Sequence, residues 1–275
     1  MLKDIVVNLT GGRPQDFAVN YAVSVAREFG AQLTGIAFVF DPVIPDAGLG
    51  GVSPSLIEMQ RDENTKTAQD AINRFMAAAK SAGLSAETRS IDASLAGATG
   101  EFGRMARRFD ISVVGQGQRD YGATEDLMIE GALFESGRPV IVVPYIQTQG
   151  LSLDRVMVCW DGGRTAARAI ADALPFLMRA KAVEVVVVTE PRKSSEVDDT
   201  HMAEHLARHG VPAVVKRITR GDIDVQSAIL SHAADFSADF IVMGGYGHSR
   251  LREFIWGGVT RNMLGAMTVP VLMSH

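Results

Sequence analysis

The sequence has little of several features that mark whole classes of protein. It contains a single cysteine, Cys159, so no disulfide can form within the chain and an oxidising compartment is not indicated. No apolar run approaches the roughly 20 residues that span a bilayer, and no signal-peptide pattern precedes the first strand-like run. The net charge of −5 provides no broad basic surface for a nucleic acid. We therefore expect a cytoplasmic protein that binds neither membranes nor nucleic acids.

The composition is that of a folded protein, with 47% apolar and 21% charged residues among 275. Short runs rich in Val and Ile alternate with longer segments of helical period. This alternation predicts an α/β fold in which helices cover both faces of parallel sheets. The predicted strands are 3–8, 33–40, 87–91, 111–115 and 140–143 in the first half, and 155–160, 183–189, 213–218, 240–244 and 269–273 in the second.

The order of elements in the first half recurs in the second, with similar sequences at corresponding places. Gly-Gly-Arg stands at 11–13 and again at 162–164, and Val-Val-Gly at 113–115 corresponds to Val-Met-Gly at 242–244. A tandem duplication accounts for these matches. The first copy is longer in its middle, where a Gly- and Pro-rich stretch is followed by a long helical segment.

The duplication predicts two domains, residues 1–145 and 154–275, joined by a linker at 146–153. Each domain is expected to be doubly wound. Its five-stranded parallel sheet would have the order 3-2-1-4-5, flanked by helices.

The most informative stretch runs from the end of a buried strand at Gly244 to a helix that starts near Gly258. Glycines allow positive φ and let the backbone approach an anion closely. The following helix presents free N–H groups and the positive end of its dipole. Thr260 adds a hydroxyl in the first turn, and Arg250 and Arg261 add charged donors. The stretch is suited to a nucleotide phosphate, although turns without a ligand also use glycine.

Asp161 follows the first strand of the same domain. In a sheet of order 3-2-1-4-5, strands 1 and 4 are neighbours, and the crevice between their carboxyl ends is the switch point. Asp161 and Gly244 are therefore expected on either side of this crevice. A carboxylate there accepts hydrogen bonds from ribose hydroxyls while the loop holds the phosphates. The alternative is that Asp161 caps the following helix.

These residues resemble the ATP-binding pattern of the universal stress protein family. That pattern is a glycine, two residues, a second glycine, nine residues, a third glycine, and then Ser or Thr. Gly244, Gly247 and Gly257 match this spacing. Gly258 stands where the family has Ser or Thr, and Arg250 replaces a frequent glycine. The similarity covers essentially the whole chain as two copies, so the chain resembles a tandem member of the family.

The resemblance implies that the second domain binds ATP, alone or with Mg²⁺. Asp161 and Gly244 would contact the ribose, and the end of the second strand, from Val187 to Thr189, would meet the adenine through main-chain atoms. The implied phosphate contacts are Gly247, His248, Arg250, Gly257, Gly258, Val259 and Thr260. Family members commonly pair through their last strands. The resemblance therefore implies antiparallel pairing of 139–143 with 270–273 in an intramolecular pseudo-dimer, and a homodimer of chains is a further prediction.

The first domain lacks the residues of this nucleotide-binding pattern. Thr10 stands where the second domain has Asp161, and residues 115–118, Gly-Gln-Gly-Gln, lack the second spaced glycine. Acidic residues in the loop that follows would repel a triphosphate, namely Asp120, Glu125 and Asp126. We expect this domain not to bind a nucleotide and to have a structural, regulatory or partner-facing role.

Three functions are compatible with these patterns. The first is an ATP-binding regulatory protein of the stress response, with at most slow hydrolysis and an unidentified protein partner. The second is an interaction scaffold in which Arg250 and Gly258 have abolished nucleotide binding. The third is a weak Mg²⁺-dependent ATP hydrolase that uses His248 as acid or base and Asp161 to hold the metal. No catalytic residue and no resident metal site is assigned, and His201, His205 and His209 are interpreted as a solvated helix face.

Overall fold

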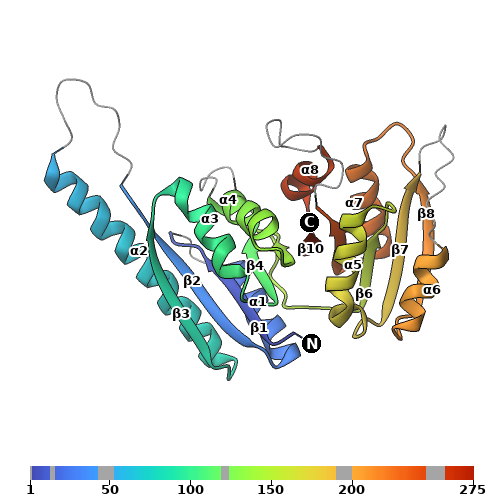
Figure 1. Ribbon diagram of the computed structural model, residues 1–275, viewed down its shortest axis with the longest axis horizontal. Helices are drawn as coiled ribbons and strands as arrows, with labels where there is room; N and C mark the ends of the chain where they lie inside the picture. The colour runs from blue at the N-terminus through green and yellow to red at the C-terminus, as the bar shows by residue number, and fades with distance from the viewer. Residues whose placement is uncertain (1, 13–15, 43–52, 119–123, 190–199, 246–257) are drawn as a thin grey trace.

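The computed structural model describes residues 2–12, 16–42, 53–118, 124–189, 200–245 and 258–275, and its strands form one ten-stranded sheet (Figure 1). The strands of the first half are β1 (Asp4–Leu9), β2 (Gln32–Phe40), β3 (Ala86–Ala93), β4 (Ile111–Gly115) and β5 (Val140–Val143). Those of the second half are β6 (Arg155–Cys159), β7 (Ala182–Thr189), β8 (Ala213–Thr219), β9 (Phe240–Gly244) and β10 (Val271–Ser274). Their order is β3-β2-β1-β4-β5-β10-β9-β6-β7-β8. Each half is therefore a parallel sheet of order 3-2-1-4-5, which confirms the predicted fold class.

Helices cover both faces of the sheet. The first half has α1 (Phe17–Phe29), α2 (Pro54–Ser81), α3 (Leu95–Ala106), α4 (Thr124–Glu130) and a π-helical turn, η2 (Gly131–Glu135). The second half has α5 (Arg164–Leu177), α6 (Thr200–Arg208), α7 (Val225–Phe236) and α8 (Gly258–Ala266). The first half is longer in its middle, as predicted, because β2 ends at Phe40 and β3 begins at Ala86, whereas β7 ends at Thr189 and β8 begins at Ala213. The N-terminal end of α2 reaches farther out than the other helices (Figure 1), and its buried residues begin only at Ala68.

Two apolar layers, one on each face of the sheet, run through both halves. Successive residues of a strand point to opposite faces, so Val7 contributes to one layer and Val6 to the other. The first layer contains residues from α1, α2, α5 and α6, among them Val25, Phe75, Phe176 and Leu206. The second contains residues from α3, α4, α7 and α8, among them Phe102, Met128, Ile229 and Met263.

The halves join where β5 and β10 pair antiparallel, with Ile141 opposite Leu272. This register confirms the predicted pairing of the two last strands. Aromatic contacts cross the same junction. The ring of Phe29 on α1 lies 4.8 Å from that of Phe176 on α5, which in turn stacks on Phe240. The junction is therefore part of the continuous core.

Candidate functional site

The candidate site lies where β6 and β9 end side by side, with Val158 opposite Val242 one or two residues before the strand ends. The chain leaves these strands in opposite directions. β6 leads through α5 to β7 on one side, and β9 leads through α8 to β10 on the other. Their carboxyl ends form a topological switch point, the place where open α/β sheets bind ligands.

Gly244 ends β9 directly against the first turn of α5. A Cβ added at this position would lie 2.6 Å from the amide nitrogen of Ala166 and 2.6 Å from Oγ1 of Thr165. Both distances are well inside van der Waals contact, so a side chain has no space here. The close approach brings the end of β9 next to the turn that carries Asp161.

Asp161 is exposed in the turn between β6 and α5. Its Oδ1 accepts a hydrogen bond of 2.8 Å from the amide of Gly163, which is the N-cap residue of α5. A capping side chain would instead bond the second or third amide of the helix. Asp161 therefore orders the turn before α5, and its carboxylate lies at the surface beside the crevice.

The end of β7 extends past β6, because the last residue pair of the two strands is Cys159 with Val186. Val187 is buried there and Thr189 is half-buried. The amide of Trp160 donates to the carbonyl of Val186, so the peptide groups of Val186 face β6. Because peptide groups alternate along a strand, those of Val188 face the same side, beyond the last β6 pair.

Thr189 has its polar groups turned toward β8. Its Oγ1 donates to the carbonyl of Ile218 at 3.2 Å, and its own carbonyl accepts from the amide of Arg220. The main chain nearest the crevice is therefore that of Val188, a residue within the predicted range 187–189 that the sequence reasoning did not single out.

α8 begins at Gly258, as predicted. Val259 is exposed at its start, whereas Thr260 is buried. Arg261 is exposed and interacts electrostatically with Asp126 of α4. Burial raises the pKa of Asp126, and the positive charge of Arg261 offsets part of that rise. The other predicted contacts, Gly247, His248, Arg250 and Gly257, lie outside the described residues.

The corresponding switch point of the first half, between β1 and β4, is filled by its own side chains. Asp16 caps α1, since its Oδ1 accepts from the amide of Val19 and its Oδ2 from the amide of Thr10, both at 3.1 Å. Thr10 and Asp16, with Gln116 and Tyr145, line a cavity of about 10 Å³. Such a volume holds about one water molecule, whereas ligand pockets measure about 300–1,000 Å³.

Helix α2 covers the same switch point from outside. A Cβ added at Gly11 would lie 2.3 Å from Cγ2 of Thr67, and Nη2 of Arg74 donates to the carbonyl of Thr10 at 3.3 Å. The loop after β1 is therefore in direct contact with a helix that belongs to the longer middle of the first half.

The structure also places the single cysteine and the three histidines of the α6 region. Burial raises the pKa of the Cys159 thiol to about 12, with a further contribution from the Asp161 carboxylate, so the thiol stays protonated at neutral pH. His201, His205 and His209 are exposed on and just after α6. Among the described residues, no group of three or more His, Cys, Asp or Glu is placed to hold a metal ion. None of the described helices is both long and apolar enough to cross a bilayer.

The sequence reasoning missed two residues at these sites. Asp16 carries a recognisable signal, an Asp directly before a helical segment. Gln116 of the first half is buried and its Nε2 donates to the carbonyl of Leu264 in α8 at 2.7 Å. No local pattern marks that contact, because it depends on how the halves meet.

Comparison with known proteins adds a family match for the second half. Residues 152–275 match the model of the universal stress protein family. A search of curated proteins gives no match.

Solved structures resemble the chain over nearly its full length. A universal stress protein from Archaeoglobus fulgidus DSM 4304 has 19% sequence identity and a TM-score of 0.72, over 98% of this chain and 96% of that one. A functionally unknown protein from Pseudomonas aeruginosa PAO1 has 13% identity and a TM-score of 0.63, over 99% and 92%. A putative universal stress protein from Pseudomonas aeruginosa UCBPP-PA14 has 13% identity and a TM-score of 0.61, over 99% and 93%. At these identities the likeness concerns the fold.

Proposed function

We propose that the second half of the chain, whose residues 152–275 match the model of the universal stress protein family, binds one adenine nucleotide, ATP in the first instance, in the crevice between β6 and β9. The bound nucleotide then determines which protein partner the chain engages in a stress response. Hydrolysis is slow or absent on this proposal. The observation that carries it is the spaced glycine pattern starting at Gly244, at the switch point and beside the exposed carboxylate of Asp161.

Each part of the nucleotide has a place in this arrangement. Asp161 would accept hydrogen bonds from ribose hydroxyls, and main-chain groups around Val188 would meet the edge of the adenine. The amides at the start of α8, from Gly258 to Thr260, would face the phosphates, because a helix N-terminus favours negative charge. Gly258 supplies this amide without the hydroxyl of the family pattern.

Magnesium fits the site as a companion of the nucleotide rather than as a resident ion. Mg²⁺ keeps most of its waters and takes oxygens from phosphates, so it needs only one or two protein carboxylates. Asp161 is an exposed carboxylate beside the crevice. With Mg²⁺ bound, part of the phosphate charge would be neutralised, while the chain's own residues bind and orient the nucleotide.

A second candidate function is an interaction scaffold that binds no nucleotide. It is favoured by the state of two predicted phosphate contacts. Thr260 is buried, and Arg261 interacts with the carboxylate of Asp126. A phosphate would have to compete with the carboxylate of Asp126 for Arg261.

Equilibrium titration of the full chain with labelled ATP separates these functions. We expect saturable binding, and we expect Asp161→Ala to weaken it by about tenfold to a hundredfold, the effect of losing hydrogen bonds to a charged acceptor. Asp235→Ala is the matched control, since Asp235 is also exposed in the second half but lies on α7. The scaffold function is favoured instead if no binding saturates below about 1 mM ATP and Gly247→Val behaves like the wild-type chain.

A further inference from the structure

The first half of the chain contacts the residue just before the undescribed part of the candidate phosphate loop, Gly245. A Cβ added at Gly245 would lie 2.9 Å from Cδ2 of Leu133 in η2, so this leucine packs directly on the glycine. The neighbouring Phe134 packs its ring against the imidazole of His275, with the centroids 4.9 Å apart. His275 in turn lies 3.1 Å from the carbonyl oxygen of Gly245 through its Nδ1. The start of the loop is thus held between η2 and the end of the chain.

The first half also contacts α8, the helix after the loop. Gln116 is buried, with its Nε2 donating to the carbonyl of Leu264 at 2.7 Å and its Oε1 accepting from the amide of Tyr145 at 3.2 Å. Leu264 lies in the last turn of α8, where carbonyls have no amide partner within the helix. Gln116 supplies the missing donor from the other half of the molecule.

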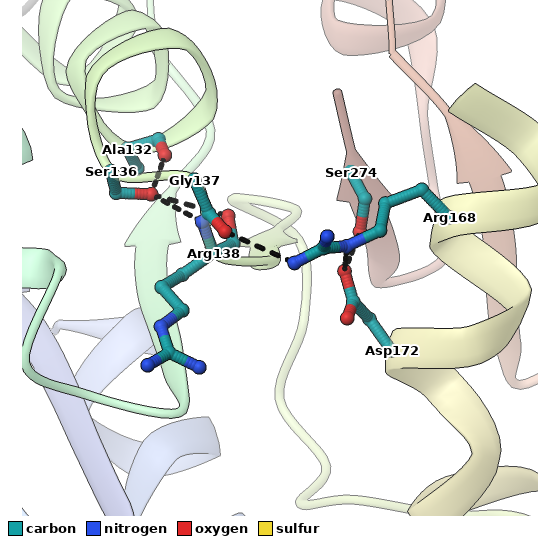
Figure 2. Close-up of polar contacts among 7 residues, drawn as sticks. All are labelled: Ala132, Ser136, Gly137, Arg138, Arg168, Asp172 and Ser274. Carbon is teal, nitrogen blue, oxygen red and sulfur yellow. Dashed lines mark hydrogen bonds and ion pairs between the residues drawn. The ribbon is translucent and has the colours of Figure 1, made fainter. Parts of the chain in front are cut away.

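A third contact reaches α5, whose first turn packs on Gly244. Figure 2 shows Arg168 of α5 extending toward the chain just after η2, where its Nη2 donates to the carbonyl of Gly137 at 3.2 Å. The same side chain pairs with Asp172, whose carboxylate accepts from Oγ of Ser274 at 2.9 Å. α5 is thereby tied both to the first half and to the end of β10.

The part of the first half that makes these contacts is itself closely packed. A Cβ added at Gly131 would lie 2.3 Å from the carbonyl oxygen of Thr99 in α3, and one at Gly103 would lie 2.6 Å from the carbonyl oxygen of Gly131. Helix α3 and η2 therefore pack closely at these two glycines. Such packing leaves η2 little freedom to move away from Gly245.

α8 needs this support because it has only nine residues. A helix of this length is marginal by itself, so its position depends on tertiary contacts and on its caps. Its first residues, from Gly258, are those that would face the phosphates. A bond that holds its last turn therefore also fixes the direction of its first amides.

We propose that Gln116 is a positioning residue for the nucleotide site of the other half, which it orients by capping α8, and that occupancy of the site is communicated to the first half through this contact. The proposal rests on the proposed function for its nucleotide part only. By linkage, if the contact favours the nucleotide-bound form, nucleotide must favour the contact by the same factor.

Hydrogen exchange of the full chain tests the contact with or without a nucleotide. In Gln116→Met, which keeps the length of the side chain but removes both hydrogen bonds, we expect the amides of the last turn of α8 to exchange about tenfold faster. Gln118→Leu is the matched control, two positions along the same segment, and should leave these rates unchanged. Unchanged α8 exchange in Gln116→Met would overturn the proposal.

Adding nucleotide distinguishes a positioning role of Gln116 from a purely structural one, because a purely structural role would not make hydrogen exchange at Gln116 respond to ATP. In the wild-type chain, saturating ATP should slow hydrogen exchange around residues 116–118. In Gln116→Met this protection should disappear. The affinity of Gln116→Met for ATP should also fall by about tenfold, in step with the faster exchange of α8. Gly245→Ala, which displaces Leu133 at the other end of the loop, should weaken ATP binding independently of Gln116. If the wild-type chain binds no ATP, the proposed function and the communication both fail, and α8 exchange in Gln116→Met still decides whether Gln116 positions the helix. ATP binding without protection at 116–118 would overturn the communication alone.

Discussion

The two switch points of the sheet share one topology and differ in what lies beyond the strand ends. In the first half, the carboxylate of Asp16 bonds the amides of Thr10 and Val19 inside the crevice. In the second half, Gly244 lies against the backbone of α5, and Asp161 stays exposed. The comparison teaches that the fold supplies a crevice in each half, whereas a few side chains decide whether it is filled.

The longer middle of the first half contributes to the same difference. α2 brings Thr67 against Gly11 and Arg74 to the carbonyl of Thr10. In the second half, the described helix at the corresponding place, α6, has only nine residues. Extra length between the second and third strands therefore covers one switch point.

The largest expected effect comes from placing a methyl group at the end of the fourth strand in each half. Gly244→Ala should lower the free energy of unfolding by about 1–3 kcal/mol, because the new Cβ meets the backbone of α5. Gly115→Ala in the first half should change it by less than about 1 kcal/mol, because the nearest atom, Cβ of Ala18, lies 3.8 Å away. Urea unfolding of the two variants checks the difference. Equal losses of stability would contradict the contrast between the two strand ends.

A smaller effect separates the two aspartates. Asp16→Ala should lower the free energy of unfolding by about 1–2 kcal/mol, the effect of losing an N-cap. Asp161→Ala should lower it by less, about 0.5 kcal/mol, because the residue is exposed and its bond to the amide of Gly163 lies in the turn before the helix. Binding should reverse the order, with ATP affinity reduced in Asp161→Ala and unchanged in Asp16→Ala. Thermal unfolding of both variants measures the loss of stability, and ATP titration of both measures the loss of affinity. If Asp16→Ala also weakened ATP binding, the contrast in role between the two aspartates would be contradicted.

The sequence alone was sufficient for most of the architecture. The ranges 111–115, 140–143 and 240–244 match β4, β5 and β9 at both ends. Each is a short, mainly apolar run, with Ser112 as the polar exception, and each has a proline or glycine at or beside one of its ends; such runs are typical of buried parallel strands. The last strand was predicted to begin at 269, which is wrong. It begins at Val271, since Pro270 has no N–H to donate to a ladder.

The position of the site in the sheet could be predicted from the sequence, whereas most of its side-chain and backbone contacts could not. Motif spacing was sufficient to place Asp161 and Gly244 at the same crevice. It did not reveal that Gly244 is required by the backbone of α5, or that Gln116 caps α8 from the other half. Both contacts depend on how elements far apart in the sequence pack, and one local pattern fits many such arrangements. Thr260, whose hydroxyl is expected to face a phosphate, is a buried residue, and its part in binding stays a prediction.

The number of nucleotide sites per chain tests the difference between the halves most directly. Equilibrium titration of the purified full chain with ATP should reach one bound nucleotide per chain, and Gly247→Val should abolish this binding. Two sites per chain would contradict the conclusion that the first switch point is filled. No saturable site below about 1 mM ATP would contradict the conclusion that the second is open to a nucleotide.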